Sequence, residues 1–122
     1  MLGIKIGIIF SLFSVLIGAF GAHGLKEILT KLNTLETFQT AVRYQMFHSI
    51  AILLSGILFQ MNMLESKLPM LLFVLGIIIF SGSLYLLSIS GIKWLGSITP
   101  IGGLLFIAGW ITLFISIHSP KI

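Results

Sequence analysis

The chain has 122 residues, of which 57% are hydrophobic and only 8% charged. Soluble domains are about a quarter charged, so this composition excludes an ordinary soluble domain and makes lipid the solvent for most of the chain. The formal charge of +4 is spread too thinly for a nucleic-acid surface, and contact with anionic lipid headgroups explains it more simply. The absence of cysteine excludes disulfides, thiolate metal sites and thiol catalysis.

Four long stretches of the chain carry no charge, and they cover residues 6–22, 44–64, 68–92 and 94–120. A helix rises about 1.5 Å per residue, so roughly 20 apolar residues cross the hydrocarbon core of a bilayer. We therefore predict an all-α membrane protein with a single domain over residues 1–122. Four transmembrane helices, at about 4–22, 33–60, 68–90 and 98–118, are expected to form an antiparallel bundle.

The first connection, from His23 to about Thr40, is the only one with a mixed-charge face, made by Lys26, Glu27, Lys31 and Glu36. Apolar residues recur at helical spacing over residues 24–32, which predicts a short amphipathic helix lying in the membrane interface. Asn33 is expected to end this helix and to begin the second span. With Glu36 three residues later, Asn33 comes close to the capping-box pattern. Arg43 is expected just inside the membrane boundary, with its guanidinium reaching outward.

The two later connections are short. Residues 62–69 read as a plain loop, with Pro69 in the first turn of the third helix. Gly91 to Gly96 form the next connection, where Trp94 is expected to anchor at the interface, and Pro100 follows near the start of the fourth helix. Four crossings put both termini on one side of the membrane and the first and third connections on the other.

Small residues recur along single faces of three predicted helices. The faces are formed by Gly7, Ser11, Ser14, Gly18 and Ala22, by Gly76, Ser83 and Ser90, and by Gly102, Gly109 and Ser116. Lipid removes the hydrophobic drive between helices, so close approach at small residues must hold them together. We predict that these faces pack the bundle, although glycine is also generally frequent in membrane helices. Trp110, near the middle of the fourth helix, is expected to pack as well.

Unusual polar residues are expected to gather at one end of the bundle. The candidate cluster consists of His23, Arg43, Tyr44, Gln45, His48, Tyr85 and Thr99. As a functional site, it would be a binding pocket or a proton relay, because histidine exchanges protons near neutral pH. Alternatively, the cluster has a structural role and links the helices through hydrogen bonds. We favour this structural interpretation. Haem ligation by His23 and His48 is a third alternative. No pair of buried carboxylates and no catalytic triad is present, so no enzyme activity, metal or cofactor is predicted.

Several segments together resemble one family of small membrane proteins, typified by bacterial YgdD and eukaryotic transmembrane protein 256. They are residues 18–25, 37–45 with His48, 80–85, 95–103 and 109–110. The resemblance covers essentially the whole chain in order. It implies a multi-pass protein with a domain of unestablished biochemical function. The motif residues of that family map onto His23, Arg43, Tyr44, Gln45, His48, Ser83, Tyr85, Thr99 and Pro100.

The sequence therefore predicts a non-enzymatic integral protein of the cell membrane with a structural or interaction role. Its expected partners are membrane lipids, other membrane proteins or a second copy of the chain. The alternative is a small transporter, channel or lipid-headgroup binder that uses the end containing His23, Arg43, Tyr44 and His48.

Overall fold

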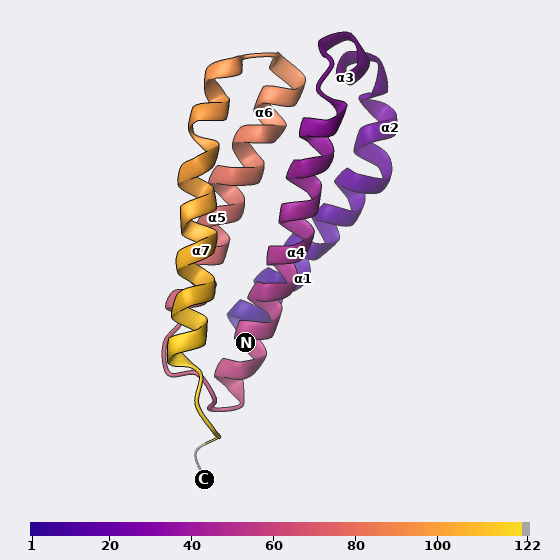
Figure 1. Ribbon diagram of the computed structural model, residues 1–122. Coiled ribbons are helices and arrows are strands. Elements are labelled where there is room, and N and C mark those ends of the chain that lie inside the picture. The colour runs from indigo at the N-terminus through magenta and orange to yellow at the C-terminus, as the bar shows by residue number, and fades with distance from the viewer. Residues whose placement is uncertain (121–122) are drawn as a thin grey trace.

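The computed structural model describes residues 1–120, which form four long helical rods (Figure 1). The first rod comprises α1 (Leu2–Leu16), η1 (Ile17–Gly21) and α2 (Ala22–Gly24), and the second is α4 (Leu35–Gln60). The third comprises α5 (Leu68–Gly76), η2 (Ile77–Ser81) and α6 (Gly82–Ser90), and the fourth comprises η3 (Lys93–Ser97) and α7 (Thr99–Ser116). All four are long and apolar enough to cross a membrane. The predicted all-α class and the four spans are confirmed.

Neighbouring rods run antiparallel and pack in the order in which they occur along the chain. The α1 helix packs along α4, α4 packs against the third rod, and the main partners of α7 are α5 and η2. The α3 end of the bundle also carries the turn between α6 and α7, and the amino terminus lies toward the opposite end (Figure 1). The third rod therefore separates the backbones of α4 and α7, and the space between these two helices is left to side chains.

A short helix, α3 (Lys26–Leu32), folds over the end of the bundle and confirms the predicted helix in the first connection. Its Leu29 is fully buried, and Leu32 lies against Gly91 at the end of α6. The predicted capping role of Asn33 is wrong. Asn33 adopts the left-handed conformation (φ 56°) and ends α3, while Thr34 precedes α4. The Thr34 hydroxyl makes no cap, because it donates to the carbonyl of Ser88 (2.6 Å) and ties this corner to α6.

Two rods contain a five-residue π-helical segment that periodicity did not predict. Within η2, the Ser81 hydroxyl donates to the carbonyl of Ala41 on α4 (2.8 Å). A π turn adds a residue to the helical repeat and re-aims the side chains around it, which is why such turns often occur at special positions. Here the backbone of Phe80 lies against Gly102 of α7, while the hydroxyl of Ser81 bonds to α4.

The glycines of the predicted packing faces lie at contacts between rods. A β-carbon added to Gly7 would come within 2.7 Å of the Leu53 backbone nitrogen, and one added to Gly102 within 2.7 Å of Phe80 Cα. Gly18 lies against Val42. Gly76 and Gly109 instead face the rings of Phe106 and Phe73. Backbone meets backbone at two of these contacts, and a ring fills the space at two others.

Two apolar clusters hold the bundle, one toward each end. Leu29, Phe38 and Val42 form the cluster near α3. The larger cluster, toward the other end, contains Ala51, Ile52, Leu64, Phe73, Ile77, Phe106 and Leu113. On α4, the residues between Val42 and Ala51 include the buried polar side chains Gln45, His48 and Ser49. The polar groups thus lie at mid-bundle, between two apolar layers.

Candidate functional site

The central polar residue is His48, which is 4% exposed and lies in the middle of α4. Its Nδ1 lies 2.9 Å from the carbonyl oxygen of Tyr44, one turn earlier on the same helix. Its Nε2 accepts a hydrogen bond from the indole Nε1 of Trp110 on α7 (3.0 Å). An indole nitrogen only donates and a carbonyl only accepts. The two partners therefore select the neutral imidazole with its proton on Nδ1, and both ring nitrogens are engaged.

Aromatic rings enclose the His48 imidazole. It stacks on Phe106 with centroids 3.6 Å apart and planes 9° apart, and Phe73 and Phe47 approach from other sides. The Tyr44 ring stands next to it and packs on Phe80, with centroids 4.3 Å apart. These contacts fix the ring in one orientation. The imidazole thereby joins α4 to α7 across the space that their backbones leave open.

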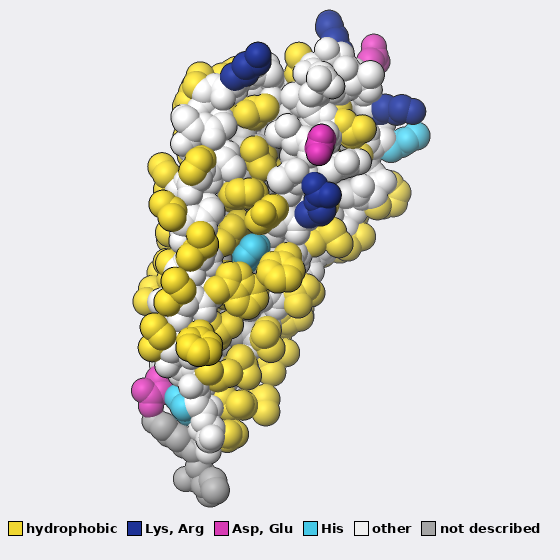
Figure 2. All heavy atoms as spheres, viewed as in Figure 1, with side chains coloured by type: hydrophobic (Ala, Val, Ile, Leu, Met, Phe, Trp, Pro, Cys, Tyr) yellow, Lys and Arg dark blue, Asp and Glu magenta, His cyan; other side chains and the backbone are white. Residues whose placement is uncertain are grey.

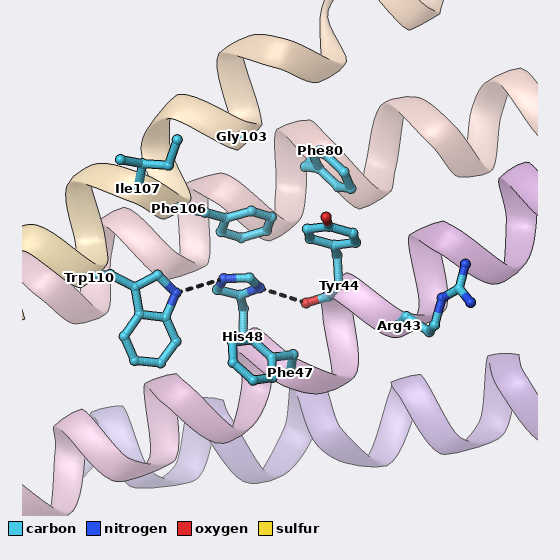
Figure 3. A pocket seen from close by; sticks show the side chains of 9 residues that line it. All are labelled: Arg43, Tyr44, Phe47, His48, Phe80, Gly103, Phe106, Ile107 and Trp110. Carbon is cyan, nitrogen blue, oxygen red and sulfur yellow. Dashed lines mark hydrogen bonds between the residues drawn. The ribbon is translucent and has the colours of Figure 1, made fainter.

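Beside these rings lies a pocket of about 620 Å³ between α4 and α7. Figure 3 shows the nine side chains that line it: Arg43, Tyr44, Phe47, His48, Phe80, Gly103, Phe106, Ile107 and Trp110. Trp110 lies at one end of the pocket and Arg43 at the other (Figure 3). We call this pocket the α4–α7 groove. Its walls are aromatic and aliphatic, with His48 in the floor and a single cation at one end.

A second polar link joins three rods through Gln45, which is 6% exposed. Its Nε2 donates to the backbone carbonyl of Phe10 on α1 (3.1 Å). Its Oε1 accepts from the hydroxyl of Tyr85 on α6 (2.6 Å). One amide thus uses its donor toward one neighbouring rod and its acceptor toward another, which fixes the relative register of all three.

Replacing Tyr85 with phenylalanine is expected to weaken this link and to leave the Gln45 oxygen without its donor. Interhelical hydrogen bonds in membranes contribute about 0.6 to 1.7 kcal/mol, so we expect a loss of this size in unfolding free energy. Reversible unfolding in mixed micelles measures it. The matched control is Ser97→Ala, because the exposed Ser97 hydroxyl bonds only to the carbonyl of Trp94 in its own turn of η3. A Tyr85→Phe protein as stable as wild type would contradict the assigned link.

The seven residues of the predicted polar cluster do not form one group. Tyr44 and His48 lie together in the groove with Arg43 at its end, and Gln45 pairs with Tyr85. Thr99 bonds instead to the Ser83 hydroxyl (2.6 Å), joining the start of α7 to α6. His23 is exposed on α2, beside the charged residues of α3. Because His48 has both nitrogens engaged and His23 lies apart, the two histidines do not converge on one ligand.

Comparison with known protein families matches residues 17–103 to "Protein of unknown function (DUF423)". The chain belongs to the DUF423 family. Its relatives include the UPF0382 membrane protein SH2409 of Staphylococcus haemolyticus, which is 44% identical over 113 residues, 93% of this chain and 92% of the relative. The UPF0382 membrane protein YwdK of Bacillus subtilis is 39% identical over 121 residues, covering 93% of each chain. That of Haemophilus influenzae is 44% identical over 101 residues, 83% of this chain and 81% of the relative. No solved structure matches the chain.

The DUF423 relatives are membrane proteins of unknown function, so this chain is a membrane protein whose activity its family does not state. The matched region contains all seven candidate polar residues, from His23 to Thr99. Trp110, which binds His48, lies beyond the end of that match.

Sequence reasoning missed two partners of the buried polar groups. Trp110 was expected to pack, and the structure adds a hydrogen bond from its indole to His48. The position of Trp110 in the middle of a predicted span could have indicated this bond, because a buried indole N–H needs a hydrogen-bond acceptor, just as a buried imidazole needs a partner. The Phe10 carbonyl that binds Gln45 gave no signal, since every helical residue has such a carbonyl. The alignment of α1 along α4 decides which of these carbonyls lies next to Gln45.

Proposed function

We propose that this protein has a non-catalytic, structural or interaction role in the cell membrane. The observation that carries the proposal is the hydrogen bonding of the polar interior. Nine polar side chains are buried among residues 1–120, and each bonds to another group of the chain. A path for ions or small solutes needs polar groups that are free to replace water around the solute. Polar groups that are already satisfied within the bundle, by their own helix or by a neighbouring one, favour a fixed scaffold over a transport path.

We further infer that the DUF423 relatives and the group typified by YgdD and transmembrane protein 256 form one family. The segments 18–25, 37–45, 80–85 and 95–103 support this inference, because they carry the resemblance to that group and all lie within residues 17–103, the region that matches the DUF423 family. The partners proposed for the scaffold are membrane lipids, other membrane proteins or a second copy of the chain. Exposed apolar side chains lie along every span, as such contacts require, and Figure 2 shows them over one face of the bundle.

The test compares permeability in vesicles with integrity in cells. In proteoliposomes, the purified full chain is expected to pass protons, potassium ions and small metabolites no faster than protein-free vesicles. In cells, loss of the protein is expected to raise dye leakage across the membrane, and the wild-type chain to restore it. Solute flux above the protein-free rate that disappears in a folded Trp110→Phe variant would overturn the scaffold role. Unchanged leakage in cells that lack the protein would also count against it.

A further inference from the structure

The α4–α7 groove changes in polarity along the axis of the bundle. Toward Trp110, its walls are the apolar and aromatic side chains of α4 and α7. Toward the α3 end of the bundle lies Arg43, about 12 Å along α4 from Leu35, and therefore within reach of the headgroup region. Figure 2 shows the same gradient over one face, where charged side chains gather toward the α3 end above a hydrophobic surface. The groove thus has a polar end and an apolar remainder, as a lipid has a polar headgroup and apolar acyl chains.

The Arg43 guanidinium is exposed and donates to the hydroxyl of Thr40 (3.2 Å). Within residues 1–120, it has no carboxylate partner. A guanidinium inside a membrane span is costly unless it reaches an anion or water, and its fork of donors fits two phosphate oxygens at once. One side chain bond to a neutral hydroxyl leaves most of these donors available. The ligand that suits this end of the groove is a phosphate group.

We propose that the α4–α7 groove binds one anionic phospholipid. Its phosphate lies on Arg43, and one acyl chain lies along the groove over Phe80, Phe106 and Ile107 toward Trp110. The charge at one end and the apolar walls below it match the two parts of such a lipid, and basic sites between membrane helices commonly bind lipid headgroups in this way. Gly103 borders open space in the groove, since a β-carbon there would come no closer than 3.9 Å to Phe80, and a larger side chain at this position would extend into that space. This site goes beyond the structural role proposed above, and either proposal can fail without the other.

Trp110 provides a direct probe of the groove. The chain has two tryptophans, so a Trp94→Phe background leaves Trp110 as the single emitter. This protein is reconstituted in phosphatidylcholine vesicles, and phosphatidylglycerol or phosphatidylcholine with dibrominated acyl chains is added at rising mole fraction. Bromine quenches indole fluorescence on contact. Brominated phosphatidylglycerol is expected to reach half-maximal quenching at an about fivefold lower mole fraction than brominated phosphatidylcholine.

Three variants test whether the preference arises in the groove. Arg43→Gln is expected to bring the ratio of the two half-maximal mole fractions to about one, whereas Lys93→Gln, which removes another exposed cation near the same end, is expected to keep it. Gly103→Leu fills the groove with Arg43 intact and is also expected to abolish the preference. Equal quenching by the two lipids in the Trp94→Phe protein would overturn the proposal. A preference that survives Arg43→Gln, or that Lys93→Gln lowers as much, would overturn it too, because it would reflect general attraction to the basic end.

Discussion

Gly102→Ala is expected to destabilise the bundle by about 1 to 3 kcal/mol, the usual effect of an extra methyl group forced into a packed contact. The added carbon would lie against the backbone nitrogen of Phe80 and 2.7 Å from its Cα. Backbone cannot rotate away as a side chain can, so α7 must separate from η2. Separation would also disturb the groove, because Phe80 and Phe106 form part of its wall. Thermal unfolding of the purified protein in detergent measures the loss.

The adjacent glycine supplies the matched control. Gly103→Ala changes the same residue type on the same turn of α7, but its β-carbon would meet only the edge of the Phe80 ring at 3.9 Å, an ordinary contact. Its unfolding midpoint is expected to equal that of wild type. Equal midpoints for Gly102→Ala and Gly103→Ala would contradict a close backbone contact between α7 and η2.

His48→Ala is expected to cost about 3 kcal/mol, because it removes a buried ring and leaves a cavity beside Phe106. It also leaves the Trp110 indole without an acceptor. Trp110→Phe keeps most of the ring volume but removes the hydrogen bond, so its expected cost is smaller, about 1 kcal/mol. Unfolding free energies of the two single variants and the double variant give the coupling between the residues.

The exposed histidine of α2 serves as the control for this series. His23→Ala removes the same side chain from an exposed position and is expected to leave stability unchanged. Additive effects of His48→Ala and Trp110→Phe would exclude a direct bond between them. A His48→Ala protein that melts at the wild-type temperature would exclude the role of His48 as a link between α4 and α7.

Local information was enough to predict the spans. The third helix was expected at 68–90 and runs through α5, η2 and α6 over that range, and the second, expected at 33–60, begins two residues later. An apolar run between charges set the bounds of the third helix, and the pattern of Asn33 and Glu36 set the start of the second. Both signals come from residues that are close together in the sequence. The capping prediction at Asn33 was wrong because Asn33 adopts the left-handed conformation that ends α3, so that Thr34 instead precedes α4 and its side chain makes no cap. The Thr34 hydroxyl is engaged by Ser88, 54 residues away, and no local pattern reports that contact.

The sequence by itself determined that the chain is a four-span membrane protein and which few polar residues deserve attention. The tertiary structure decided how those residues divide: Gln45 to α1 and α6, His48 to Trp110, Thr99 to Ser83, and Arg43 to the end of the groove. In water, an apolar stripe reveals which face of a helix turns inward. In lipid, both faces are apolar, so rotation and register follow from close backbone approach and interhelical bonds, which exist only once the helices have packed.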